Sequence, residues 1–286
     1  MATIGVQAST IKASFAQDGP YETLRKVADL GYHAIEISQV AMTPENVAEM
    51  RRAQDELGVT IAALNASLTA PVGMPGDSLT GSYDKILGDC RTLGTSILRI
   101  GMLPFDAMTS LDRVLDFARQ TNQVARRLAD DGVDLYYHNH HVEFAKFDGR
   151  YMLDLIAETA PDVGLELDVH WIHRGGLDPV RVLAQYAGRV RLVHLKDYRI
   201  GALPDSALGL LAAGDFPGFM TAFTGVVQFA EVGEGTLDWP AIIDQAVASG
   251  AEFLLVEQDD TYGRDPFESL AISRRNLVEL GYGSMF

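Results

Sequence analysis

Short apolar runs alternate along the chain with longer segments in which apolar residues recur every three or four positions. The short runs are rich in β-branched residues and have the length of buried strands, whereas the spacing of Leu24, Val27 and Ala28 is typical of one helix face. The expected strands are Thr3–Ser9, Ala34–Ser38, Thr60–Ser67, Ile97–Gly101, Val133–His140, Val163–Val169, Val190–Asp197 and Glu252–Asp259. The pattern therefore predicts eight successive βα units.

The residues at the ends of the helical segments support this division. Several segments open on a capping residue followed by proline, as at Thr43, Asp178 and Asp265. Glycine, which ends many helices in a left-handed conformation, follows seven of them, at Gly31, Gly58, Gly94, Gly132, Gly188, Gly250 and Gly281.

Eight βα units in 286 residues favour a closed parallel barrel over an open sheet. An open nucleotide-binding sheet would more often carry a glycine-rich phosphate turn after its first strand, and residues 9–19 contain no GxGxxG. The GEG at 233–235 is too short for such a motif, so NAD binding is not supported. We predict a single (β/α)₈ TIM-barrel domain over residues 1–286.

One stretch, residues 198–228 after the seventh strand, is too long for an ordinary loop. Connections of more than about 15 residues are usually functional lids or contact surfaces. Its apolar residues would be awkward in open solvent: Leu203, Leu208, Leu210, Leu211, Phe216, Phe219, Met220 and Phe223. We expect this insertion to cover the barrel mouth or contact a second polypeptide, the alternative being a small helical insertion that folds back on the barrel.

Charge and cysteine content narrow the function classes. Lys and Arg number 23 against 39 Asp and Glu, and a formal charge of −16 disfavours nucleic acid and anionic membranes as partners. Cys90 is the single cysteine, which excludes an intrachain disulfide and a thiolate cluster. With neither an export signal nor a membrane anchor in the pattern, we expect a cytoplasmic location.

Polar residues gather at the ends of the last four expected strands. In a barrel these ends face one shared mouth, which would bring together Glu143, Asp168, His194 and Glu257. A single acidic residue at a strand end is more often a helix cap or an ion-pair partner, but three carboxylates buried together would be costly without a cation. Such a pocket suits one divalent ion, with Mn²⁺ preferred and Mg²⁺ or Co²⁺ as alternatives.

Histidines lie beside the expected metal ligands. His138 and His140 share one face of the fifth strand by its two-residue period, so both could point inward. At least one of the histidines in YHNHH is then expected to orient a ligand through a hydrogen bond instead of binding metal itself. His170, next to Trp171, could edge the pocket.

Taken together, the motifs YHNHHVEF, ELDVHW, VHLKDYR, EVGEGTLDW and VEQDD resemble the sugar phosphate isomerase/epimerase family of xylose isomerase-like barrels. The resemblance covers nearly the whole chain and implies one Mn²⁺-type ion held by Glu, Asp, His and Glu, which map onto Glu143, Asp168, His194 and Glu257. The ketose epimerases carry their first glutamate within strand five, where this chain has Tyr137 and His138. His138 or His140 is therefore an alternative to Glu143 as ligand.

The chemistry that such a site favours is removal of a proton next to a carbonyl, with a metal stabilising the enediolate. The candidate bases are Glu257, His140 and His138. Lys196 and Arg199 could hold a substrate oxygen or phosphate, or simply be surface cations. For substrate binding we also expect Glu36 to contact hydroxyl groups and Trp171 to form an apolar wall against the sugar, with His170 at the pocket edge.

Four functions remain open from the sequence. The first is an isomerase or epimerase acting on a ketose, an inosose or a similar ketone. The second, to which the resemblance also extends, is a subunit of a bacterial C-glycoside deglycosidase, which enolises a 3-keto glycoside and eliminates the aglycone with a small partner subunit. The assembly would then be a homo-oligomer or a hetero-oligomer with that subunit.

The two other functions come from different classes. Apurinic endonucleases use a trinuclear zinc site with more histidines and a basic face, and the seven histidines and the charge of −16 disfavour them. A sugar-binding barrel without catalysis is the last alternative.

Overall fold

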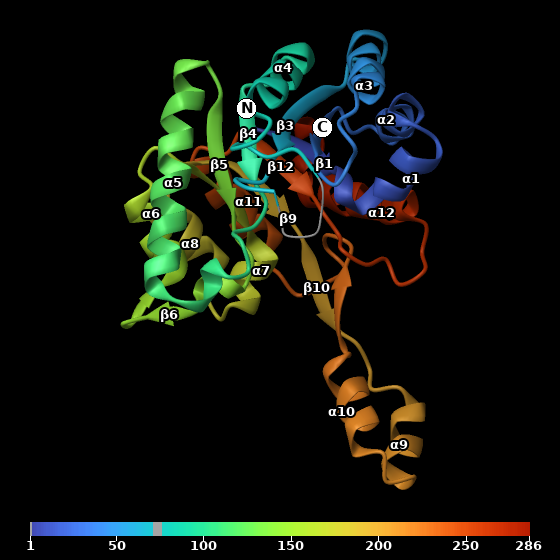
Figure 1. Cartoon of the computed structure of the whole chain (residues 1–286). Coiled ribbons are helices and arrows are strands. Elements are labelled where there is room, and N and C mark those ends of the chain that lie inside the picture. The colour runs from blue at the N-terminus through green and yellow to red at the C-terminus, as the bar shows by residue number, and fades with distance from the viewer. Residues whose placement is uncertain (1, 71–75) are drawn as a thin grey trace.

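The computed structural model describes residues 2–70 and 76–286, and eight parallel strands form a closed barrel at its centre (Figure 1). Around the barrel the strand order is β1-β12-β9-β8-β5-β4-β3-β2, and β1 pairs with β2 to close it. The strands are β1 (Thr3–Gln7), β2 (Ala34–Ile37), β3 (Thr60–Asn65), β4 (Ile97–Ile100), β5 (Asp134–His138), β8 (Gly164–Asp168), β9 (Val190–Leu195) and β12 (Phe253–Val256). The predicted TIM barrel is confirmed, and all eight expected runs form its strands.

Helices surround this barrel and alternate with its strands. They are α1 (Lys12–Gln17), α2 (Pro20–Asp29), α3 (Pro44–Leu57), α4 (Tyr83–Leu93), α5 (Leu111–Asp130), α6 (Met152–Thr159), α7 (Val169–Arg174), α8 (Pro179–Gln185), α11 (Trp239–Ala248) and α12 (Pro266–Leu277). Short helical turns lie at η1 (Ala8–Ile11), η2 (Ala107–Thr109), η3 (Val142–Phe144), η4 (Val278–Tyr282) and η5 (Gly283–Met285), and a small hairpin joins β6 (Lys146–Phe147) to β7 (Arg150–Tyr151).

The residues that predicted the helix ends lie at those ends in the structure. The side chains of Thr43, Asp178 and Asp265 each accept a hydrogen bond from a backbone N–H in the first turn of the next helix. Gly58 and Gly94 end α3 and α4 with φ of 68° and 65°, a left-handed conformation that costs residues with a side chain more than it costs glycine.

The interior of the barrel is packed and is not a channel. One cluster of buried residues fills it between the strands, namely Ala62, Ala63, Ile97, Tyr136, Leu192 and Leu255. A Cβ atom on Gly164 would lie 2.1 Å from the ring of Tyr136, so glycine is needed where β8 passes this ring. Filling of the interior leaves the mouth at the carboxyl ends of the strands as the place for a site.

The insertion forms an arm that projects from the barrel (Figure 1). Its stalk is an antiparallel ribbon of β10 (Asp197–Ile200) and β11 (Val227–Ala230), and its tip consists of α9 (Asp205–Ala212) and α10 (Phe216–Thr224). Because β10 follows β9 almost directly, the arm leaves from the mouth end, but its two helices point away from the mouth. The expectation that this segment covers the mouth is therefore wrong for the two helices, and its contact with a second polypeptide stays a prediction.

Within the described parts of the chain, no helix combines the length and apolar character needed to cross a membrane.

Candidate active site

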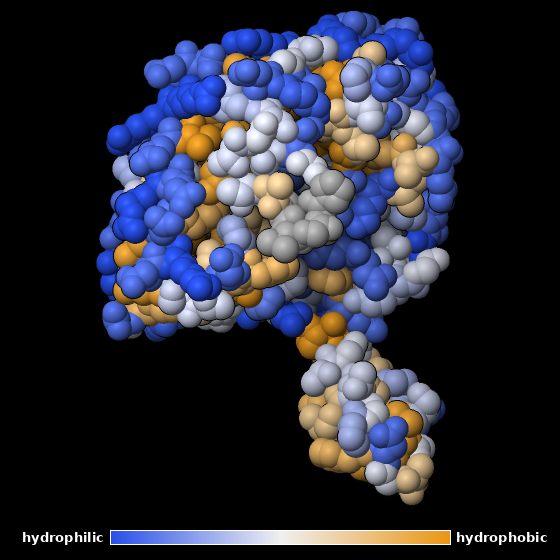
Figure 2. All heavy atoms as spheres, in the orientation of Figure 1, coloured by the Kyte–Doolittle hydropathy of each residue, from blue (hydrophilic) through white to orange (hydrophobic). Residues whose placement is uncertain are grey.

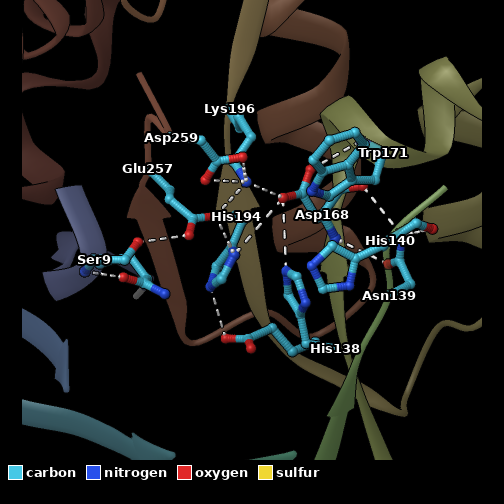
Figure 3. Close-up of polar contacts among 12 residues, drawn as sticks. Ser9, His138, Asn139, His140, Asp168, Trp171, His194, Lys196, Glu257 and Asp259 are labelled. Carbon is cyan, nitrogen blue, oxygen red and sulfur yellow. Dashed lines mark hydrogen bonds and ion pairs between the residues drawn. The ribbon is translucent and has the colours of Figure 1, made fainter. Parts of the chain in front are cut away.

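Four buried side chains converge where neighbouring strands end at the mouth, from β5, β8, β9 and the residue after β12 (Figure 3). Strand register brings them together, since Asp168 pairs with His194 between β8 and β9 and His138 pairs with Glu166 between β5 and β8. Their side-chain donor atoms all lie within 4.8 Å of one another, in the group His138, Asp168, His194 and Glu257. The sequence had placed three of these four at one site and had named His138 as an alternative ligand.

The donor atoms of this group are those that a metal ion would satisfy. Four buried atoms of the group face one another across the mouth: His194 Nδ1 lies 3.0 Å from Glu257 Oε2, and His138 Nε2 lies 3.6 Å from Asp168 Oδ2. Two of these atoms are carboxylate oxygens, and burying like charges close together is costly unless cations offset them. Two imidazole nitrogens and two carboxylate oxygens converging in this way fit a transition-metal ion.

Glu143, the first expected ligand, is not brought into this group. It lies in the turn η3, where its carboxylate accepts hydrogen bonds from the Tyr137 hydroxyl (2.6 Å) and the His140 backbone N–H (2.8 Å). Burial raises the pKa of Glu143 to about 7. The strand ends at His138, so the five residues that follow turn Glu143 away from the mouth and leave His138 to face it.

A second group of charged residues lies against the other side of His194. Its Nε2 is 3.1 Å from Glu166 Oε1 and 3.4 Å from Glu36 Oε2, and the Arg99 guanidinium on β4 contacts both carboxylates, at 2.6 Å from Glu36 and 3.1 Å from Glu166. Burial and the neighbouring Glu36 raise the pKa of Glu166 to about 8. One carboxylate, one carboxylic acid and one guanidinium then balance at neutral pH without a metal.

Lys196 lies beside the mouth-facing group (Figure 3). Its ammonium nitrogen is 2.7 Å from Glu257 Oε2, 3.2 Å from Asp168 Oδ2 and 3.1 Å from both oxygens of Asp259. Burial alone would lower the pKa of Lys196, but these carboxylates outweigh it and raise the pKa above its ordinary value. Three carboxylates face one ammonium here, which gives this side of the mouth an excess of negative charge that a cation would offset.

The histidines divide by their surroundings. Burial lowers the pKa of His138 to about 4, of His140 to about 3 and of His170 to about 4, so each is neutral at pH 7. Burial also disfavours the charged form of His194, but the carboxylates on both its sides outweigh this and hold its pKa well above the ordinary value. A proton on His194 therefore offsets part of this negative charge, and a metal ion bound at this imidazole would take the place of that proton.

Backbone contacts fix Asp168 and its neighbours. Asp168 caps α7, because its Oδ1 accepts from the Trp171 backbone N–H at 3.0 Å. Its own N–H donates to Asn139 Oδ1 at 3.0 Å, which ties the end of β8 to the residue after β5. Asp168 Oδ2 is left to face the mouth.

The GEG segment has a structural role. The carboxylate of Asp197 accepts hydrogen bonds from the backbone N–H groups of Gly233 (3.1 Å), Gly235 (3.2 Å) and Thr236 (3.1 Å), and from the Trp239 indole (2.7 Å). A Cβ atom on Gly235 would lie 2.1 Å from Asp197 Oδ1. The GEGTLDW segment therefore holds Asp197 in place, at the start of β10 and directly after Lys196.

Aromatic side chains form one wall of the mouth. The ring centroids of His170 and Trp171 are 4.7 Å apart, and Phe229 from the base of the arm lies 5.0 Å from His170 and 6.1 Å from Trp171. The Lys196 ammonium lies 5.2 Å from the Trp171 ring centre. His140 is half-buried beside this wall, with its ring 5.7 Å from Trp171.

Two expected substrate contacts lie elsewhere. Glu36 is fully buried against Arg99 and His194, so its carboxylate faces these groups and not a substrate. Arg199 lies on the stalk of the arm, opposite Gln228.

Sequence reasoning missed Arg99, Glu166 and Asp259. Two of them carried a signal: Arg99 is a charge inside a buried strand, and Glu166 is two residues before Asp168 and hence on the same strand face.

Two curated proteins are similar to part of the chain. The rhizopine catabolism protein MocC of Rhizobium meliloti is 29% identical over 59% of this chain and 50% of its own length. The inosose dehydratase of Geobacillus thermodenitrificans is 27% identical over 55% of this chain and 51% of its own. The chain thus spans about half the length of these relatives.

Solved structures match over the whole fold. A sugar phosphate isomerase/epimerase from Parabacteroides distasonis superposes with a TM-score of 0.75, at 19% identity over 98% of this chain and 99% of the other. The IOLI protein with a binding zinc atom superposes with a TM-score of 0.64, at 17% identity over 99% of both chains.

A family model covers most of the barrel, from residue 24 to residue 277. Since this match and the closed eight-stranded barrel agree, the chain belongs to the xylose isomerase-like TIM barrel family.

Proposed function

We propose that this protein is a metal-dependent enzyme that enolises a sugar-like ketone, a ketose or an inosose, at the barrel mouth. The observation that carries the proposal is the convergence of four buried donor atoms, two imidazole nitrogens and two carboxylate oxygens, in a cluster where carboxylates outnumber the lysine that faces them. We assign His138, Asp168, His194 and Glu257 as the ligands of one divalent ion.

The donor set bears on which metal is held. With His138 in place of Glu143, half of the donors are nitrogen, and Mg²⁺ is rarely bound by imidazole. We therefore keep Mn²⁺ as the first candidate, with Co²⁺ as an alternative, and add Zn²⁺. The zinc atom of the similar IOLI protein is consistent with this set. Bound there, such an ion polarises a carbonyl oxygen and stabilises negative charge on it.

His140 is the proposed base. It is neutral, half-buried and outside the ligand group, and its ring lies 4.7 Å from that of His138. Its pKa of about 3 makes it a weak base before substrate arrives. Negative charge developing on a bound substrate would raise this pKa and so favour transfer of the proton to the imidazole.

Lys196 is the proposed oxygen holder and acid. Its ammonium stays protonated beside Asp168, Glu257 and Asp259, so it can donate to a substrate oxygen. Trp171, Phe229 and His170 exclude water on one side of this ammonium and give an apolar face against which a sugar ring can pack. We assign to Glu36 an orienting role toward His194 in place of a substrate contact.

After the first proton transfer two outcomes are open. Return of a proton to the other face of the same carbon gives an epimer, and return to the neighbouring carbon gives an isomer. Loss of a β-oxygen or β-carbon substituent, which leaves with its bonding electrons and a proton from Lys196, gives an elimination. The similarity to an inosose dehydratase favours loss of water as the second candidate function, and a 3-keto C-glycoside would lose its aglycone by the same steps.

A substrate panel separates these outcomes. The protein loaded with Mn²⁺ is incubated with inososes, free ketoses and 3-keto glycosides, and the products are identified by NMR. We expect epimer or isomer from one class, or a product with a new double bond from another, and neither with His140→Asn. Tight binding of these ketones without conversion of any would instead indicate a sugar-binding barrel.

A further inference from the structure

The tip of the arm, residues 201–226, exposes more large apolar side chains than any other part of the described structure. Figure 2 shows hydrophobic residues gathered over its two helices, at a distance from the barrel. The exposed members on the arm and at the end of its stalk are Ile200 (60% exposed), Leu203, Leu208 (59%), Leu211, Phe216 (59%), Met220 and Phe223 (54%). Exposed apolar patches of this kind mark binding surfaces.

The apolar residues of α10 are spaced for packing against another helix. Phe216, Phe219, Met220 and Phe223 stand at positions i, i+3, i+4 and i+7, which is one face of a helix. The phenylalanine rings form a continuous ladder, with 6.2 Å between the centroids of Phe216 and Phe219 and again between those of Phe219 and Phe223. Leu208 and Leu211 stand at i and i+3 on α9.

The two helices do not cover this face for each other. Only Ala207 is fully buried in α9, and no residue of α10 is buried. Helices of 8 and 9 residues are marginal in water without tertiary packing, so this pair needs a further surface to hold it.

The small number of charged residues on the arm indicates what kind of surface packs against it. The only charged residues at 201–226 are Asp205 and Asp215, and Asp215 caps α10 through the Gly218 N–H. A partner recognised by ionic contacts would find almost nothing to bind here. The rest of the chain is strongly acidic, with −16 overall, so two copies repel through their barrels but not through their arms.

We propose that the arms of two copies of this chain pack against each other to form a four-helix core, and that the protein is a dimer through this contact. A two-fold contact uses the same patch on both copies, and an apolar stripe at helical spacing is complementary to itself. Seven apolar side chains of one arm, each between 36% and 60% exposed, can form the apolar centre of a standard interface, in which each partner buries roughly 800 Å². This inference does not depend on the proposed activity.

Sedimentation of the full chain tests the proposal, at concentrations from about 1 to about 100 µM because association follows mass action. We expect a dimer for the wild type and a monomer for Phe223→Glu, since two buried carboxylates would face each other across the contact. Phe105→Glu is the matched control, because Phe105 is 75% exposed on the barrel and should leave the dimer intact. Circular dichroism checks that each variant folds.

Two results would overturn the proposal. If the wild-type chain stays monomeric at the highest concentration, the arm does not bind a second copy, and its partner would be a different polypeptide. A dimer that survives Phe223→Glu, or that Phe105→Glu disrupts, would place the contact on the barrel.

Discussion

His194 is the residue on which both charged groups meet. Its Nδ1 faces Glu257 at 3.0 Å and Asp168 at 3.8 Å, whereas its Nε2 faces Glu166 at 3.1 Å. A carboxyl group behind a metal-binding imidazole fixes the orientation of the ring and the nitrogen that is left for the metal. Arg99 in turn holds Glu166, so a residue buried within strand β4 takes part in shaping the site.

Replacement of the carboxyl group behind His194 should therefore weaken metal binding. We expect Glu166→Gln to lower Mn²⁺ affinity by about 10- to 100-fold, measured by calorimetric titration of the metal-stripped protein. Glu143→Gln is the control, because Glu143 is equally buried but bonds to Tyr137 and the His140 backbone outside the group. Equal affinities in the two variants would show that Glu166 does not orient His194.

The two histidines of strand β5 and its end should separate metal binding from turnover. We expect His138→Asn to lower metal affinity by at least about 10-fold and His140→Asn to lower kcat by about 100-fold or more with metal affinity retained. Melting temperatures tell these effects from a loss of folding. If both variants lose stability and activity in parallel, the histidines serve the core and not the site.

Glu143 gives the protein a dependence of stability on pH. Its pKa is raised by burial from 4.5 to about 7, so the folded protein binds more protons than the unfolded chain between these values. Protonated Glu143 contributes fully to the free energy of unfolding below pH 4.5. This contribution is lost as the pH rises through 7, and the free energy of unfolding falls by up to about 3 kcal/mol. In denaturant titrations, Glu143→Gln should remove this slope, and an unchanged slope would assign it to another group.

At the scale of elements, the sequence predicted more about the barrel than about its mouth. The eight strands were visible because each is a short apolar run, but most were expected to be longer than they are. Strand β5 was expected as Val133–His140 and is observed as Asp134–His138. The chain leaves the sheet where polar residues begin, and the residue at which it leaves decides whether His138 or Glu143 faces the mouth. The types of residue along the strand do not by themselves show where it ends.

The arm shows a second limit of the same kind. Its apolar residues indicated a contact surface. The ribbon of β10 and β11 carries the helices away from the mouth, and it depends on strand pairing, such as that of Tyr198 with Phe229, which the local sequence pattern does not predict. Only the aromatic residues at the base of this ribbon lie near the site.

Removal of the arm tip should separate assembly from catalysis. We expect replacement of residues 201–226 by a short Gly-Ser turn, with Tyr198 and Phe229 kept, to abolish the dimer and to change kcat/KM by less than about 10-fold, because the helices point away from the mouth. Sedimentation and steady-state kinetics measure the two effects. A large loss of kcat/KM with unchanged metal affinity would mean that the arm tip helps to form the site.

At the scale of the molecule, the barrel gathers its charges at one end. Strands far apart in sequence deliver Glu36, Arg99 and Glu257 to neighbouring positions, and the acidic excess of the chain extends to the mouth, where three carboxylates face one lysine. The family and fold were predictable because motifs on four successive strands share this mouth. The balance of charge around His194 could not be predicted from the sequence, since Arg99 and Glu166 come into contact only when the barrel closes.

Exchange of substrate hydrogen with solvent tests metal-dependent enolisation most directly. A ketose or inosose that the protein binds is placed in D₂O, and the hydrogen next to the carbonyl is followed by proton NMR with Mn²⁺-loaded protein, metal-stripped protein and Asp168→Asn. We expect its signal to disappear only with the loaded wild type, because abstraction of this proton needs the polarised carbonyl. Equal exchange by the stripped protein, or no exchange by a loaded protein that binds the ketone, would contradict metal-dependent enolisation.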